Sequence, residues 1–196
     1  MSIVLYFVDK VNLNQRRLIM SFQKINYPTD KVKMYRLLVA QATSLMENCP
    51  HLMSNLANLS ALLGSALVDI NWVGFYLIPK YFPEYYPLEK LGDTKNLLVV
   101  GPFQGLPACV EIKIGNGVCG SAVAQNKIML VPNVHEFPGH IACDSASNSE
   151  IVLPIHNATG DAIAVLDIDS PLYERFDEKD RNGLLNIVEI LEKNLR

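Results

Sequence analysis

Long apolar runs are missing from this chain, since none approaches the roughly 20 residues that a membrane-spanning helix requires. The opening apolar segment is short and has neither a basic start nor a small-residue cleavage site, so we expect no signal peptide. A strong charge of either sign is also missing, because the net charge is only -3. We therefore expect neither nucleic acid nor an anionic membrane as a partner. We expect a cytoplasmic location, with the nucleus left open as a second compartment.

Cysteine is scarce, with four residues in the chain, yet three of them lie in one glycine-rich region. Cys109, Cys119 and Cys143 have Gly, Pro, Asn, His and Asp as neighbours, which predicts turns near solvent, whereas inert cysteines usually lie in apolar runs. Clustered thiols in a reducing compartment indicate catalysis, redox chemistry or metal binding. A zinc site would also need His135 or His140, and the cysteines form no CxxC pair, so we expect no bound metal.

Apolar spacing predicts helices near both ends of the chain. The dipeptide Thr29-Asp30 is a typical helix cap, and a leucine stripe at helical spacing follows in residues 52–63. A last amphipathic helix is expected after the cap Asp177. Residues 1–28 show no sustained periodicity, so we expect a peripheral or poorly ordered extension there and one folded domain over residues 29–196.

Short apolar segments between these helices predict five or six strands. They are separated by turn residues, which indicates hairpins and a mostly antiparallel central sheet. Two longer connections, residues 79–96 and 132–149, interrupt the pattern, and connections above about 12 residues tend to have a function. The prediction is an α+β fold with the N-terminal helices and the C-terminal helix packed on one side of the sheet. The expected strands cover residues 70–78, 97–100, 109–114, 128–131, 151–155 and 162–168.

Two carboxylates alternate with apolar residues on the last predicted strand. Asp167 and Asp169 point to the same side, because successive side chains of a strand face opposite ways. An isolated pair of this kind is often a solvated strand end, but here an apolar run precedes it, so we expect both acids beside a packed sheet. Closely spaced carboxylates repel each other, which raises the proton affinity of at least one of them.

Several motifs taken together resemble one known family. The segments WVGFY, GPFQG, GNGVCG, PGHIACD and VLDIDS follow one another in this order, with a further cysteine before GNGVCG. This pattern resembles the GAF-domain free methionine-R-sulfoxide reductases over roughly residues 69–196, whereas residues 1–28 have no counterpart in it. The resemblance implies a GAF fold, no bound cofactor, and an enzyme that reduces free L-methionine-R-sulfoxide with thioredoxin as the reductant. It also implies a homodimer built on the terminal helices.

The resemblance assigns roles to the cysteines. Cys143 matches the attacking nucleophile and Cys109 the resolving cysteine, which implies a sulfenic acid on Cys143 and then a disulfide between the two. Cys119 matches a third cysteine that assists, either as an alternative resolver or as a relay to the reductant. Cys49, which precedes a proline at a helix end, is interpreted as structural.

Substrate-binding roles follow from the same resemblance. Glu150 matches a third acid of the family, beside Asp167 and Asp169. We assign Asp167 to the α-ammonium of the substrate, and Glu150 and Asp169 to the sulfoxide oxygen, with the division among the three left open. Trp72 and Tyr76 match an aromatic pocket for the methyl group on sulfur, and on a strand they would point the same way.

Other residues near the predicted nucleophile leave alternatives open. Backbone amides of residues 141–142 are candidates for binding the α-carboxylate, because no basic residue is clearly placed for it. His135 is interpreted as a residue that stabilises its loop by a hydrogen bond, while His140 stays open between that role and activation of Cys143. A non-enzymatic GAF module that senses a small metabolite or the redox state is the alternative function, since a fold does not fix a function.

Overall fold

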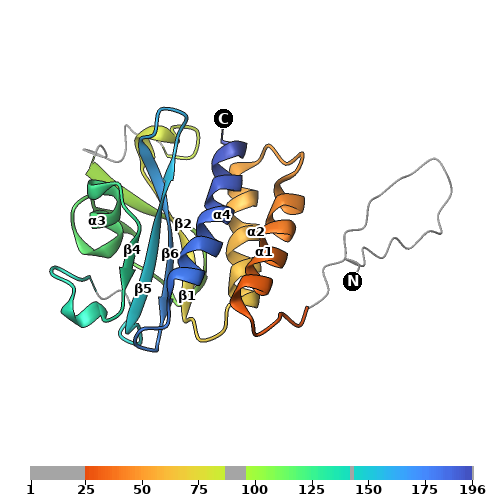
Figure 1. Ribbon diagram of the computed structural model, residues 1–196. Helices are drawn as coiled ribbons and strands as arrows, with labels where there is room; N and C mark the ends of the chain where they lie inside the picture. Colours follow the sequence, from red (N-terminus) through yellow and green to blue (C-terminus); the bar gives the residue numbers. More distant parts are fainter. Residues whose placement is uncertain (1–24, 87–95, 142–143, 196) are drawn as a thin grey trace.

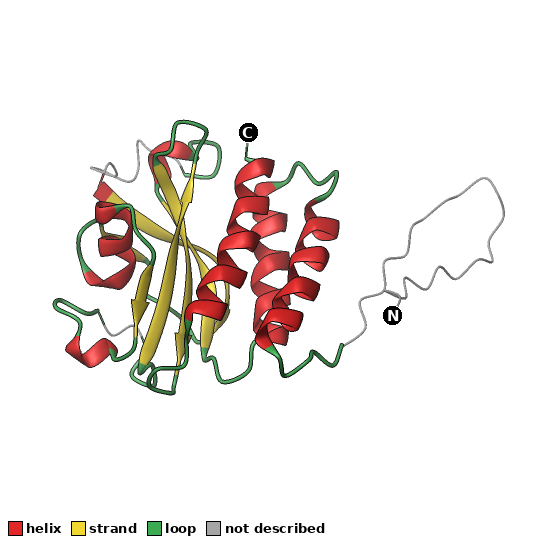
Figure 2. Cartoon of the chain, viewed as in Figure 1, coloured by secondary structure: helices red, strands yellow, loops and turns green. Residues whose placement is uncertain are grey.

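The computed structural model describes residues 25–86, 96–141 and 144–195 of the chain. Its centre is a six-stranded sheet in the order β3-β2-β1-β6-β5-β4, and every neighbouring pair is antiparallel (Figure 1 and Figure 2). The predicted α+β fold with a mostly antiparallel sheet is therefore confirmed. The strands are β1 (Trp72–Leu77), β2 (Leu97–Gly105), β3 (Glu111–Lys113), β4 (Met129–Val131), β5 (Ser149–His156) and β6 (Ala162–Ser170).

Three helices cover one face of the sheet, as Figure 1 shows: α1 (Lys31–Met46), α2 (Leu52–Ala66) and α4 (Glu178–Asn194). Two of the helix starts agree with the sequence, because Asp30 caps α1 by accepting a hydrogen bond from the backbone N–H of Lys33, and Asp177 forms a capping box on α4. Apolar side chains of the three helices pack against β1, β5 and β6 in one buried core. Among the described residues, no helix has the length and apolar character that spanning a membrane would take.

The opposite face of the sheet packs against the short helix α3 (Gly117–Gln125) (Figure 1). A second buried cluster lies here, between α3 and side chains of the central strands. Strand alternation explains the division, since Phe75 and Leu166 belong to the core under the three helices while Tyr76 and Val165 belong to the cluster under α3. Side chains on this second face are therefore free to form a site without interrupting the main core.

The register of the central strands places three predicted site residues in one row. Trp72 of β1 pairs with Asp169 of β6, and Asp169 pairs with Glu150 of β5. In the neighbouring row Asp167 pairs with Gly74 of β1. A Cβ atom at Gly74 would lie 2.6 Å from the Trp72 ring, so glycine here leaves the space that the ring occupies.

The structure differs from the predicted strand boundaries where strands meet this row. The sequence predicts Cys109 within a strand, but β3 starts two residues later. Strands β5 and β6 are longer than predicted and include the polar residues Ser149 and Ser170, which brings Glu150 into the sheet. Both serines are buried with their hydroxyls donating to loop carbonyls, so polar residues continue these strands at little cost.

A buried carboxylate joins α1 to α4. Asp180 is 0% exposed and accepts hydrogen bonds from the Tyr35 hydroxyl (2.9 Å), from Arg175 Nη1 (3.3 Å) and from Lys31 Nζ. Its charge is thus compensated by two cations, as a buried carboxylate requires. Gly183, further along α4, lets the Tyr35 ring pack directly on the helix, because a Cβ atom there would overlap the ring.

The predicted boundary between an extension and the domain at residues 28 and 29 stays a prediction, since residues 1–24 lie outside the described residues. The described end of that segment contacts the domain, because the Tyr27 hydroxyl donates a hydrogen bond to Gln41 Oε1 of α1 (2.9 Å). The predicted connection 79–96 begins with a single 3-10 turn, Pro79–Tyr81, and its residues 87–95 are outside the described chain.

Candidate active site

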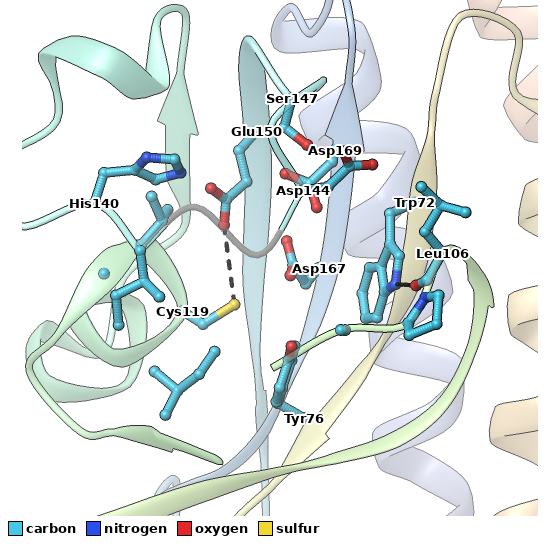
Figure 3. Close-up of a pocket in the computed structure, with 16 residues that line it drawn as sticks. Trp72, Tyr76, Leu106, Cys119, His140, Asp144, Ser147, Glu150, Asp167 and Asp169 are labelled. Carbon is cyan, nitrogen blue, oxygen red and sulfur yellow. Dashed lines mark hydrogen bonds between the residues drawn. The ribbon is translucent and has the colours of Figure 1, made fainter. Parts of the chain in front are cut away.

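A pocket lies between α3 and the ends of the central strands β1, β5 and β6 (Figure 3). The strands form its floor and α3 forms one wall, while residues 106–108, 140–141 and 144–147 close the remaining sides. The pocket brings together most of the site residues that the sequence predicts. These are Trp72, Tyr76, Cys119, Glu150, Asp167 and Asp169.

Aromatic rings from β1 form the side of the pocket away from α3. The rings of Trp72 and Tyr76 are stacked with their centroids 5.8 Å apart, which confirms that the two side chains point the same way. The indole Nε1–H donates to the carbonyl oxygen of Leu106 (3.2 Å), and the Tyr76 hydroxyl donates to the carbonyl oxygen of Cys109 (3.1 Å). Both rings are buried and held by these hydrogen bonds, so they form a rigid apolar surface.

Three carboxylates lie opposite these rings. Glu150 and Asp167 are buried, since each residue is only 6% exposed to solvent, and Asp169 is partly buried. Burial raises the pKa of Asp167 to about 6. The pKa values of Glu150 and Asp169 are well above their ordinary values, because burial disfavours the charged form and the Asp167 charge repels theirs. The expected repulsion is therefore present, but burial is the larger cause.

Cys119 corrects one prediction from the sequence, since it lies on α3 and is only 4% exposed rather than near solvent. Its neighbours in sequence are small and turn-like, but Val118, Cys119 and Ala122 form the buried side of a short helix. Its Sγ donates a weak hydrogen bond to Glu150 Oε1 (3.9 Å) (Figure 3). Burial, followed by the nearby carboxylates, raises the pKa of this thiol well above its ordinary value, so Cys119 is a neutral thiol.

The other two predicted redox cysteines are less completely described. Cys109 is partly buried and disulfide-bonded, and it lies in the connection between β2 and β3. Cys143 and its neighbour Ala142 lie outside the described residues, so the disulfide between Cys109 and Cys143 and the amide contact at residue 142 stay predictions. Cys49 is free and partly buried at the end of α1, away from the pocket, which agrees with a structural role.

The two histidines of the long loop have different environments. His135 Nε2 lies 2.8 Å from Asn148 Oδ1, which confirms its interpretation as a residue that stabilises the loop. His140 lines the pocket, with its ring centroid 6.4 Å from that of His135. Burial and then the neighbouring imidazole lower the pKa of His140, so its ring is neutral at physiological pH. Whether it activates Cys143 stays open.

Three polar residues of the site are absent from the sequence prediction. The amide Nδ2 of Asn71 donates to Asp144 Oδ2 (2.8 Å) and to Ser147 Oγ (2.9 Å), which anchors the loop after Cys143 to the start of β1. Asp144 and Ser147 also line the pocket. Their position directly after PGHIAC was the available signal, whereas Asn71 carries no signal beyond its place before Trp72.

The pocket also contains a set of potential metal ligands. Cys119 Sγ and carboxylate oxygens of Glu150 and Asp167 all lie within 4.8 Å of one another and are buried. Within the described lining, no lysine or arginine offsets the negative charge of the three carboxylates. The site is therefore suited to a cationic group, whether an ammonium or a metal ion.

Comparison with known proteins agrees with this geometry. The chain matches the GAF domain family over residues 51–194. It is 47% identical to the free methionine-R-sulfoxide reductase of Escherichia coli (strain K12) over 166 residues, which cover 85% of this chain and 91% of that protein.

Solved structures with a similar fold include two in complex with substrate. One is a free methionine-R-sulfoxide reductase from Neisseria meningitidis in complex with its substrate, with a TM-score of 0.77, 38% identity, and coverage of 87% of this chain and 94% of that one. The other is fRMsr of Staphylococcus aureus in complex with substrate, with a TM-score of 0.73, 47% identity, and coverage of 89% and 100%. The chain belongs to the GAF domain family and, within it, to the free methionine-R-sulfoxide reductases.

Proposed function

We propose that the protein reduces free L-methionine-R-sulfoxide to L-methionine through a cysteine nucleophile. Family membership and the substrate complexes of two similar structures support this reaction. The observation that carries the proposal is the pocket itself, in which the stacked rings of Trp72 and Tyr76 lie opposite three carboxylates with raised pKa values. An apolar wall and a strongly acidic wall match the two ends of a small amino acid with a methyl sulfoxide.

Substrate recognition divides along these walls. The methyl group on sulfur packs against the Trp72 and Tyr76 rings, through contacts that sulfur groups commonly make with aromatic rings. Asp167 binds the α-ammonium, because its pKa of about 6 leaves it ionised at neutral pH. Backbone amides at residues 141–142 bind the α-carboxylate. A peptide-bound methionine sulfoxide lacks both charges and is therefore excluded.

The remaining two acids serve the sulfoxide oxygen. Burial, followed by repulsion from the Asp167 charge, raises the pKa values of Glu150 and Asp169 well above their ordinary range, which favours the protonated forms that can donate a proton. Protonation of the oxygen makes the sulfur more electrophilic at the moment when the thiolate attacks. Carboxyls with raised pKa values beside Asp167, whose pKa is about 6, give the pocket both a proton donor and an anion.

Cys143 and Cys109 carry out the proposed reduction in successive thiol steps. The Cys143 thiolate bonds to the sulfoxide sulfur, and the oxygen, which takes a proton from an acid of the pocket, moves to Cys143 sulfur. The sulfur–oxygen bond of the substrate and the transient sulfur–sulfur bond break, methionine leaves, and Cys143 is oxidised to a sulfenic acid. The Cys109 thiol then attacks Cys143 sulfur, which forms a disulfide and releases water. Two electrons from an external dithiol return both cysteines to thiols, and we propose thioredoxin as that dithiol. The disulfide-bonded state of Cys109 supports this sequence of steps.

Cys119 has an auxiliary role in this scheme. As a buried neutral thiol it is a poor nucleophile, so it becomes a resolver or a relay only when its environment changes. We further propose a homodimer through the terminal helices and a cytoplasmic location, with the nucleus as a second compartment. No bound cofactor is needed for any of these steps.

NADPH consumption in the presence of thioredoxin and thioredoxin reductase tests the reaction. Free methionine-R-sulfoxide, its S epimer and an N-acetylated analogue are compared as substrates. Turnover of the free R form alone is expected, because the S epimer misplaces the oxygen and acetylation removes the ammonium charge. No turnover with any of the three would favour the non-enzymatic sensor instead.

Cysteine variants test the assigned order of steps. Cys143→Ser is expected to abolish methionine formation, because serine cannot form a sulfenic acid. Cys109→Ser is expected to release one methionine per protein in a single turnover and then to stop, since recycling needs the disulfide. Quantifying methionine by chromatography separates the two outcomes, and multiple turnovers by Cys143→Ser would overturn the assignment of the nucleophile.

A further inference from the structure

The inner end of the pocket gathers three ligand atoms from three different elements. Cys119 comes from α3, Glu150 from β5 and Asp167 from β6, and one sulfur and two carboxylate oxygens lie within 4.8 Å of one another (Figure 3). All three residues are buried. Thiolate sulfur and carboxylate oxygen are both ligand types that Zn²⁺ accepts, so the three residues together could hold a borderline divalent metal ion.

An independent observation points to a ligand at this place. Asp167 is only 6% exposed, and its Oδ1 atom is buried without a hydrogen-bond partner among the described residues. A buried carboxylate oxygen without a partner costs free energy, so it indicates a place that a cation or a donor group fills. Figure 3 shows Asp167 directed into the pocket between Cys119 and Trp72.

Charge in the pocket favours a cation as that ligand. Within the described lining, the only side chain that can become positive is His140, and the lowered pKa of its ring keeps it neutral. Asp144 and Asp169 add further carboxylates around the cluster. Opposite charges at short range are worth several times more in a buried site than in water, so a divalent cation is strongly attracted here.

We propose that Cys119, Glu150 and Asp167 form an inhibitory site for Zn²⁺ or a similar borderline divalent cation. Thiolate ligands select zinc over Mg²⁺ and Ca²⁺, which prefer oxygen ligands alone. Three protein ligands leave a fourth position open toward the pocket for water. The metal replaces the protons of its ligands: bonds from the metal to sulfur and oxygen form, and the displaced protons pass to solvent.

Inhibition follows because the metal and the substrate ammonium need the same carboxylate. Bound Zn²⁺ consumes the negative charge of Asp167, so it raises the apparent KM for the sulfoxide and leaves kcat unchanged at saturating substrate. This consequence depends on the proposed function, whereas metal binding itself does not. Affinity for the metal rises with pH, since ligand protons must leave before the metal binds.

A variant with a single cysteine isolates the site in the full-length chain. Replacement of Cys49, Cys109 and Cys143 by serine leaves Cys119 as the only thiol of the protein. Titration with Co²⁺ under anaerobic conditions is expected to give one equivalent bound, with the near-ultraviolet absorption of a thiolate–cobalt bond. Added Zn²⁺ should remove this band by displacing the cobalt.

The matched control is the same variant with Cys119→Ser. It should lose the band and bind Zn²⁺ at least about 100-fold more weakly. Loss of a residue that only hydrogen-bonds to a metal ligand already lowers metal affinity about 10- to 100-fold, and loss of the ligand itself should cost more. Asp167→Asn in the single-cysteine background should weaken binding to a similar degree. The proposal is wrong if the Cys119→Ser control binds metal as tightly as its parent. Absence of a cobalt band, both in the single-cysteine variant and in the oxidised wild-type protein, contradicts it equally.

Substrate competition separates this proposal from the proposed function. Free methionine-R-sulfoxide is expected to displace cobalt from the single-cysteine variant and so weaken its absorption band, whereas the N-acetylated analogue should leave the band unchanged. If the protein binds cobalt through Cys119 but does not reduce the sulfoxide, the metal site is supported and the proposed reaction is refuted. If the protein reduces the sulfoxide but binds no cobalt, the reaction is supported and the metal site is refuted.

Discussion

Replacing Asp167 by asparagine is expected to make the protein more stable at neutral pH while it weakens substrate binding. Burial raises the pKa of this carboxyl from 3.8 to about 6, so folding works against its ionisation. Each pKa unit corresponds to about 1.4 kcal/mol, so ionised Asp167 costs about 3 kcal/mol of folding free energy at neutral pH. Asparagine has nearly the same shape and never ionises, so the variant avoids this cost.

The sign of the pH dependence follows from the direction of the shift. A carboxyl whose pKa is raised by folding contributes its full stability below the unfolded value of 3.8, and loses it as the pH rises through about 6. The difference between variant and wild type should therefore be largest above about pH 7 and should vanish toward pH 4. Removal of the Asp167 charge also lowers the pKa values of Glu150 and Asp169, which adds to the stabilisation.

Thermal unfolding at pH 7.5 and pH 4.5 measures this effect. For a domain of this size a gain of about 3 kcal/mol raises Tm by about 6 to 12 °C. Glu189→Gln on the exposed side of α4 removes the same charge outside the pocket and should change stability by less than about 0.5 kcal/mol. A variant at position 167 that is no more stable than wild type at pH 7.5, or a gain that is the same at both pH values, would refute the reasoning.

Three further changes test other parts of the structure. In the Cys143→Ser variant, which lacks the nucleophile, the affinity for the sulfoxide should fall about tenfold per pH unit below about pH 6, because protonated Asp167 cannot pair with the ammonium. Calorimetry measures this affinity, and a value that is constant between pH 5 and 8 contradicts that role of Asp167. Asn71→Ala should lower kcat/KM by about tenfold or more, since the loop loses its hydrogen bond to Asp144, while the unfolding free energy changes by only about 1 kcal/mol; unchanged kinetics would show that the anchor is not needed. Gly183→Ala should destabilise the protein by about 2 kcal/mol in denaturant unfolding, because the new methyl group overlaps the Tyr35 ring; equal stability would mean that α1 and α4 can separate there.

Most of the fold follows from patterns that are local in the sequence. The aromatic and β-branched residues of Trp72–Leu77 and the apolar run within Ala162–Ser170 predict both strands, and the alternation of side chains along a strand predicts the face that each one occupies. The same alternation places Trp72 beside Tyr76 and Asp167 beside Asp169. Helix starts were also predictable, because the caps Asp30 and Asp177 act within three residues of themselves.

The parts of the site that could not be predicted depend on contacts across the chain. Cys119 has small, polar neighbours in sequence, and only the packing of α3 against β5 and β6 buries it. Asn71 and Asp144 are 73 residues apart, and no local pattern connects an amide before one strand to a carboxylate in a distant loop. The burial of Glu150 likewise requires the register of β5 on β6, which sequence periodicity leaves open.

The position of the acids in the fold explains how the protein tolerates them. Glu150 and Asp167 lie on central strands, yet they face away from the core that packs under α1, α2 and α4. The carboxylates are therefore buried beside the smaller cluster under α3, which is separate from the main core. A rigid sheet then fixes the distances among acids and aromatic rings, while Cys109 lies outside the strands, where a sulfur can exchange bonding partners. Recognition and thiol exchange thus depend on different parts of the structure, so a substitution such as Asp167→Asn can weaken one and still increase stability.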